Sequence, residues 1–252
     1  IVQKIIPDRP LTEADEVKAR YLDKELLATP SLALDRVRLE ILRQGERVTA
    51  MLDRSLPALL DGQKEEIDEL AKMDDAVDAL HGQIVTYLGN ISQAPHSEEE
   101  TGELLGLLEA ANSLENIGDI VETNLVGLGQ HRIEENLTVS AATREVLEGF
   151  HSVVYRAVDT AIQAVTQRNA RAAHMVIEMK SEIQELMVSA EIHQSRRLIA
   201  EEPNRLPAYR IEMDILQSMR RIYYFAKRMA RGVVPALQVE EEAYSASADS
   251  AA

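Results

Sequence analysis

The sequence contains no cysteine and no tryptophan, and only 4% of its 252 residues are aromatic. Without cysteine, disulfides and thiolate metal sites are excluded, so a bound metal would need oxygen or imidazole ligands. Residues that suit sheets are scarce, whereas Leu, Ala, Glu, Arg and Ile dominate and favour packed helices. Because 45% of the residues are hydrophobic, the chain can supply a sizeable core. We therefore predict an all-α fold.

Positive charge is also scarce, since 27 Lys and Arg residues face 43 Asp and Glu residues and give a formal net charge of -16. The phosphate backbone of DNA or RNA would be repelled by this average field, which excludes nucleic acid as a partner. The sequence also lacks an apolar run as long as a membrane-spanning helix, and we expect this chain by itself to be soluble. It contains no phosphate-binding loop, nucleophile elbow or zinc-protease helix, which argues against an enzyme.

The chain contains an internal repeat of about 106 residues. A shift of 106 pairs Leu56 with Ile162 and Met73 with Met179, and a shift of 105 pairs Ile117 with Ile222. Apolar stripes at helical spacing run through three consecutive segments of each copy, which predicts two antiparallel three-helix bundles. We divide the chain into a lead-in (1–30), a first repeat (31–136), a second repeat (137–235) and a disordered tail (236–252).

Prolines, glycines and capping residues predict where the helices begin and end. Ser97 with Glu100 matches a capping box, and Thr29 followed by Pro30 matches a helix start. The predicted helices are a short one over 13–27 in the lead-in, then 30–60, 64–88 and 97 to about 127–129 in the first repeat. In the second repeat they follow Ser140, Asn169 and the segment 203–207, and the last one ends at Gly232.

The two copies differ at one set of charged positions. The carboxylates Asp74, Asp78, Glu115 and Asp119 of the first copy correspond to Lys180, Gln184, Arg220 and Tyr224 of the second, and Glu122 corresponds to Lys227. Carboxylates four residues apart share one helix face, and Asp74 and Glu115 lie at similar depth, roughly 30 Å from the hairpin between their helices. Such a cluster can hold a hard cation, although acidic residues at this spacing also form solvated helix faces.

Two segments resemble those of a known family. Leu114-Glu115-Asn116-Ile117-Gly118-Asp119 looks like the signature helix of PhoU domains, in which Glu or Asp, three residues and then Asp supply metal ligands. The stretch from Met73 to Leu80 resembles the partner helix, and six helices in two halves is also the PhoU architecture. The resemblance covers about residues 31–233. It implies a metal site at Asp74, Asp78, Glu115 and Asp119 for a divalent or iron-type cation (Mg, Mn, Fe or Zn).

The lead-in adds a second resemblance. Arg20-Tyr21-Leu22-Asp23, Leu26-Leu27 and Thr29-Pro30 resemble the junction after the membrane part of bacterial sodium-dependent phosphate cotransporters that carry a PhoU-like C-terminal domain. An apolar start at Ile1 rather than Met also indicates a piece of a longer protein. The resemblance implies a regulatory, non-catalytic domain at the cytoplasmic face of the bacterial inner membrane. Its expected partners are the transmembrane transporter domain of the same polypeptide and a second copy in a homodimer.

The second repeat departs from the two-site pattern of that family. Lysine and arginine offer no acceptor for a cation, so we expect one cation site rather than two. The reversed charges suggest an anion site or pairing with acidic residues. Basic residues gather in the last two helices, where they form salt bridges with nearby glutamates or contact a membrane surface. They are Arg196, Arg197, Arg205, Arg210, Arg220, Arg221, Lys227, Arg228 and Arg231.

Three other interpretations fit the sequence. The chain could be a metal-free helical scaffold for assembly, or a stand-alone PhoU-type regulator of phosphate uptake. Asp78 with His81 and Glu148 with His151 have the carboxylate-to-histidine spacing of di-iron bundles, which gives an oxidase as the third alternative. These two pairs fall in different repeats and would have to face each other in one bundle core.

Overall fold

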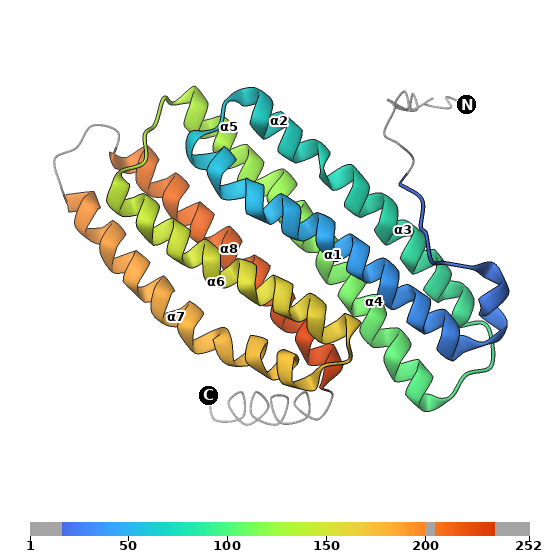
Figure 1. The fold of residues 1–252 in the computed structure, drawn as a ribbon. Helices are drawn as coiled ribbons and strands as arrows, with labels where there is room; N and C mark the ends of the chain where they lie inside the picture. The colour runs from blue at the N-terminus through green and yellow to red at the C-terminus, as the bar shows by residue number, and fades with distance from the viewer. Residues whose placement is uncertain (1–16, 200–204, 235–252) are drawn as a thin grey trace, which may run out of the picture.

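The computed structural model describes residues 17–199 and 205–234, and all regular structure in these ranges is helical. The prediction of an all-α fold is therefore confirmed. Figure 1 shows two three-helix bundles lying side by side, with α1 to α5 in one and α6 to α8 in the other. None of the helices in the described part of the chain combines the length and apolar character needed to cross a membrane. The predicted tail (236–252) and the first sixteen residues of the lead-in lie outside the described residues.

The first bundle contains three helical rods, two of which are interrupted. Its elements are α1 (Pro30–Asp61), α2 (Lys64–Lys72), α3 (Asp74–Ile91), α4 (Glu98–Asp119), the π-helical η2 (Ile120–Leu125) and α5 (Val126–Glu134). The sequence predicts one continuous helix over 64–88, whereas the structure breaks it at Met73. The prediction that the third rod ends near Gly127 and Gly129 is wrong, because the helix continues to Glu134. Gly129 lies inside the helix, where a side chain would collide with Ile67 of α2.

The second bundle contains α6 (Ala141–Thr166), α7 (Ala170–Ile199) and α8 (Arg205–Val233). The structure confirms the predicted N-cap residues at three helix starts. Ser97 and Glu100 form the capping box of α4, the Ser140 side chain accepts a hydrogen bond from the Thr143 N–H, and Asn169 accepts one from the Ala172 N–H. At α1, Pro30 occupies the first position, but the Thr29 side chain makes no capping hydrogen bond.

The two bundles share one hydrophobic core, in which α1 packs against α6 and α4 against α8. The approach of α1 to α6 is very close at Gly45, where a Cβ atom would lie 2.8 Å from Ile162 Cδ1. Polar contacts also cross the boundary. Arg228 of α8 forms a two-pronged ion pair with Glu109 of α4, at 2.5 Å and 2.8 Å. The repeats therefore form one packed body.

The described part of the lead-in runs over α1 and α3 without forming the α-helix that we predicted for 13–27. Residues 17–23 are irregular, and Lys24–Ala28 form a short 3-10 helix, η1. The carboxylate of Glu40, which is fully buried, accepts hydrogen bonds from the N–H groups of Arg20 and Tyr21, both at 3.0 Å. It also pairs with Arg43. These partners satisfy backbone groups that a helix would satisfy internally, and so they stabilise the extended path.

Gln83 of α3 holds the same segment from the other side. Its side-chain carbonyl accepts a hydrogen bond from the Ala19 N–H at 2.8 Å, and its amide donates to the Val17 carbonyl at 2.7 Å. One turn further along α3, the Tyr87 hydroxyl donates to the Asp23 carbonyl at 2.6 Å. The lead-in is thus fixed to two helices of the first bundle.

Candidate metal centre

Three of the four predicted ligands come together where the start of α3 lies beside the end of α4. Asp74, Asp78 and Asp119 each offer a carboxylate oxygen, and these oxygens lie within 4.8 Å of one another. Within residues 17–199 and 205–234, no other group of three or more His, Asp or Glu side chains comes so close together. Carboxylates four residues apart on α3 face Asp119 across the helix pair because helical spacing places them on one side.

The fourth predicted ligand, Glu115, lies one helical turn before Asp119 and is not part of this group of three. The relative position of the helices explains this arrangement. Gly118 packs directly against Asp74, and His81 of α3 lies 2.9 Å from Asn112 of α4, so α4 is offset by about one turn from the equal-depth estimate. Glu115 still contributes to the charge of the site, since it raises the pKa of Asp74.

Asp74 is the most deeply buried member, with 3% of its surface exposed. Its Oδ1 atom is buried and has no hydrogen-bond partner among the described residues. The pKa of this carboxyl is raised from 3.8 to about 7, first by burial and then by the negative charges of Asp78, Glu122, Asp119 and Glu115, in that order. A buried carboxylate without a donor is costly unless a proton or a cation neutralises it.

Burial and like charge also act on the neighbouring acids. The pKa values of Asp78 and Glu115 are both raised, first by burial and then by the charge of Asp119, while His81 opposes the shift. Four carboxyl groups therefore share a region in which full ionisation is unfavourable. A bound cation would remove this penalty and make full ionisation favourable.

Gly118 is part of the site, although the sequence does not predict a role for it. It lies inside the signature segment from Leu114 to Asp119. An added Cβ atom would collide with Oδ1 of Asp74 and would lie 3.4 Å from Val77. The absence of a side chain at Gly118 leaves room for the Asp74 carboxylate against α4. This requirement depends on which residue faces Gly118, and that is not visible from one helix alone.

The helix changes to π geometry directly after Asp119. The segment η2 (Ile120–Leu125) has the wider turn that is common at functional sites, and it carries Glu122. Glu122 lies close enough to Asp74 to raise its pKa. Glu122 is one of the five positions that contrast between the repeats, but the predicted site does not include it.

The donor set suits a hard cation. Asp74, Asp78 and Asp119 supply oxygen ligands, the buried Oδ1 of Asp74 needs a partner, and Glu115 and Glu122 add negative charge. Mg²⁺, Mn²⁺ and ferrous or ferric iron take such oxygen ligands, whereas Zn²⁺ usually adds nitrogen or sulfur ligands. The identity of the cation stays a prediction.

The histidine pairs of the di-iron alternative are not brought together. His81 Nε2 lies 2.9 Å from Asn112 Oδ1, and His151 Nε2 lies 2.8 Å from the carbonyl oxygen of Leu52 in α1. In the described part of the chain, neither histidine belongs to a group with metal-ligand spacing. This geometry does not support a di-iron oxidase.

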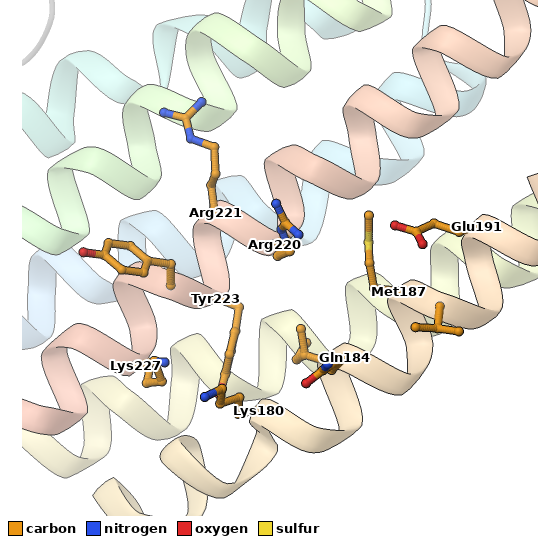
Figure 2. A pocket seen from close by; sticks show the side chains of 11 residues that line it. Lys180, Gln184, Met187, Glu191, Arg220, Arg221, Tyr223 and Lys227 are labelled. Carbon is orange, nitrogen blue, oxygen red and sulfur yellow. The ribbon is translucent and has the colours of Figure 1, made fainter. Parts of the chain in front are cut away.

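The repeat counterparts of the acidic residues lie between α7 and α8. Lys180, Gln184, Arg220, Tyr224 and Lys227 all line one pocket there (Figure 2). The side chains of Arg196, Arg197 and Arg205, which belong to the basic stretch predicted to contact a membrane surface, lie outside the described residues.

Comparisons with known proteins find similarity within the first repeat. Residues 41–123, which include the whole acidic group, match the family model of the PhoU domain. A protein of Salmonella typhimurium named as a candidate inorganic phosphate export protein, YjbB, is 32% identical over 120 residues, which are 48% of this chain and 22% of that protein. The corresponding protein of Escherichia coli K12 is 31% identical over 118 residues, or 47% and 21% of the two chains. The matches thus span about a fifth of these relatives' length.

Solved structures extend the similarity to both repeats. The crystal structure of PhoU from Pseudomonas aeruginosa matches with a TM-score of 0.74 at 19% identity, covering 81% of this chain and 97% of that one. The phosphate transport system regulatory protein PhoU from Streptococcus pneumoniae matches with a TM-score of 0.72 at 15% identity, covering 82% and 95%. The predicted PhoU-like six-helix bundle is confirmed.

Proposed function

We propose that this chain, which has the PhoU fold and a PhoU domain over residues 41–123, regulates phosphate transport by binding a cation at Asp74, Asp78, Asp119 and Glu115. The observation that carries the proposal is the buried Oδ1 atom of Asp74, which has no hydrogen-bond partner in the described part of the molecule and lies near four further acids. A cation that neutralises them would tighten the contact between α3 and α4. Regulation would follow from this change in packing rather than from catalysis.

We further propose that the regulated transporter is the membrane part of the same polypeptide. Two observations support this. The curated relatives are several times longer than the matched segment and are named for phosphate export, and the lead-in resembles the junction of sodium-dependent phosphate cotransporters. In that arrangement the domain works in cis at the cytoplasmic face of the inner membrane, and the lead-in carries its state to the transporter.

Thermal unfolding tests the cation site. Protein treated with EDTA is titrated with Mg²⁺, Mn²⁺, Zn²⁺ and, without oxygen, Fe²⁺, and at least one cation is expected to raise Tm. The variant Asp74→Asn/Asp119→Asn keeps side-chain shape but removes two charges. We expect it to have a higher Tm than the wild type in EDTA, because repulsion is relieved, and to lose most of the cation-induced rise.

The matched control is Asp53→Asn/Asp214→Asn, which removes two exposed charges from α1 and α8. It should respond to cations as the wild type does. A wild-type Tm that no cation changes would refute the metal site and would leave the metal-free scaffold as the better description. A cation response that survives Asp74→Asn/Asp119→Asn would place the binding elsewhere.

A further inference from the structure

The pocket between α7 and α8 contains every repeat counterpart of the acidic residues around Asp74. Each of the five positions that differ in charge chemistry contributes a lining residue, and the pocket has a volume of about 570 Å³. The second repeat therefore places a pocket with basic and neutral lining residues at the positions where the first repeat has its acidic residues. The lining residues that replace the acids are Lys180, Gln184, Arg220, Tyr224 and Lys227.

The charges of the pocket are predominantly positive and poorly compensated. In Figure 2, Lys180 of α7 lies close to Lys227 of α8, and Arg220 lies further along α8. Neither Lys180, Arg220 nor Lys227 forms an ion pair with another described residue. Lys227 is partly buried, and burial and the charges of Arg231 and Lys180 lower its pKa. An anion between these groups would relieve their repulsion.

Two other charged lining residues contribute less to the charge near Lys180 and Lys227. Arg221 points away from the opening toward the first bundle, where its guanidinium lies 3.4 Å from Asn124 Oδ1 (Figure 2). Glu191 is the one acidic lining residue, and along α7 it lies beyond Met187, away from Lys180. The cationic end near Lys180 and Lys227 is therefore separated from the carboxylate.

The pocket also has buried apolar and aromatic lining residues. Ile183, Met187 and Tyr223 are buried, and the Tyr223 hydroxyl donates to the Val176 carbonyl at 3.0 Å. At the rim, Tyr224 exposes 52% of its surface. A single phosphate ion would fill only a small part of this volume, which is within the range of small-molecule sites. The combination of cations, apolar floor and exposed aromatic ring suits a phosphate attached to an organic group.

We propose that this pocket binds the phosphate group of a small phosphorylated molecule, with a nucleotide as the representative ligand. Lys180, Arg220 and Lys227 hold the phosphate oxygens through charge-assisted hydrogen bonds, Gln184 adds a neutral donor, and the organic part covers Met187 and Tyr224. The site uses none of the acidic residues, so it goes beyond the proposed cation-dependent regulation and does not rest on it. The domain would then carry one site for a cation and one for an anion.

Isothermal titration calorimetry of the chain in EDTA, at constant ionic strength, tests the pocket. The ligands are ADP, inorganic phosphate, and adenosine as a probe without phosphate. We expect saturable binding of ADP and none of adenosine. Lys180→Gln/Arg220→Gln should weaken ADP binding by about tenfold or more, because two charged hydrogen-bond donors are lost. Lys64→Gln/Arg171→Gln, which removes one exposed lysine and one exposed arginine elsewhere, should leave affinity unchanged.

Inorganic phosphate distinguishes two sources of the phosphate group. Tighter binding of ADP than of phosphate would support an organic ligand, whereas equal affinity would support phosphate itself, and both depend on Lys180 and Arg220. Circular dichroism and Tm verify that each variant is folded.

Failure of ADP and phosphate to bind at millimolar concentration would overturn the proposal, as would unchanged affinity in a folded Lys180→Gln/Arg220→Gln variant. Binding only to vesicles containing phosphatidylserine would also overturn it, in favour of a membrane surface. Because EDTA is present, none of these outcomes depends on the cation site.

Discussion

Asp74 makes the stability of the metal-free protein depend on pH. Its pKa is 3.8 in ordinary surroundings and about 7 in the folded protein, so between these values the native state binds more protons than the unfolded state. Stability should therefore fall as pH rises from 3.8 to about 7, with a slope of up to about 1.4 kcal/mol per pH unit from this group. Urea unfolding in EDTA at pH 5, 6, 7 and 8 measures the effect.

The variant Asp74→Asn provides the comparison, because an amide does not titrate. Its stability should vary less with pH over the same interval, while Asp53→Asn on the exposed face of α1 should vary as the wild type does. A saturating cation competes with the proton and should make the wild type more stable at pH 8 than it is without the cation. An equal slope in the wild type and Asp74→Asn would show that other groups carry the pH dependence.

Gly118 offers a second test at the residue scale. Gly118→Ala should displace the Asp74 carboxylate from its position against α4 and weaken cation binding by about tenfold or more. Gly82→Ala on α3 has no atom within 4 Å of the added methyl group, so it should stabilise the helix by up to about 1 kcal/mol and leave cation binding unchanged. Cation titrations followed by Tm distinguish the two. Similar cation affinities for both variants would contradict the packing argument.

At the scale of the elements, the buried carboxylate of Glu40 is one of the groups that hold the lead-in. Glu40→Ala removes the acceptor of the Arg20 and Tyr21 N–H groups and should cost about 1–3 kcal/mol where this segment packs. Hydrogen exchange should become faster at Arg20 and Tyr21 before it changes in α6 to α8. Glu46→Ala, on the exposed side of α1, is the control and should leave both amides protected. Unchanged exchange in Glu40→Ala would mean that Gln83 and Tyr87 hold the lead-in without Glu40.

Helix starts marked by cap residues could be predicted from the sequence, whereas breaks within helices could not. Ser97 with Glu100 and Ser140 are cap residues whose side chains act on adjacent backbone groups, and they predicted helix starts correctly. The break at Met73 and the π-helical η2 were not predicted, because the apolar stripe continues through both. The lead-in was predicted as helical because its local pattern fits a helix, whereas the residues that keep it extended, Glu40 and Gln83, come from distant parts of the chain.

At the scale of the whole molecule, the contact between repeats can be tested at Gly45. Gly45→Val should push α1 away from Ile162 of α6 and destabilise the protein by about 1–3 kcal/mol. Ile162→Ala alone leaves a cavity, but in combination with Gly45→Val the added methyl groups fill part of it. The double variant should therefore be less destabilised than the sum of the single variants in urea unfolding. Strict additivity would contradict a direct contact.

The repeat explains both what could be predicted about the site and what could not. Aligned apolar stripes predicted that Asp74, Asp78 and Asp119 share a helix pair, and the structure places their carboxylates together. Counting residues from the hairpin placed Glu115 opposite Asp74, but the count assumes that both helices begin at the same height. The offset of about one turn depends on how side chains such as His81 and Asn112 meet across the pair. Sequence spacing within each helix does not contain that information.

The hydrogen bonds of the lead-in give α3 a mechanical role. Gln83 grips the chain at Val17 and Ala19, and the same helix carries Asp78 little more than one turn away and Asp74 at its start. A force applied to the chain at Val17 would therefore be transmitted to α3 through Gln83. An axial or rotational shift of α3 would in turn displace Val17. The lead-in and the acidic group are therefore connected through one helix, at Gln83 and at Asp74 and Asp78.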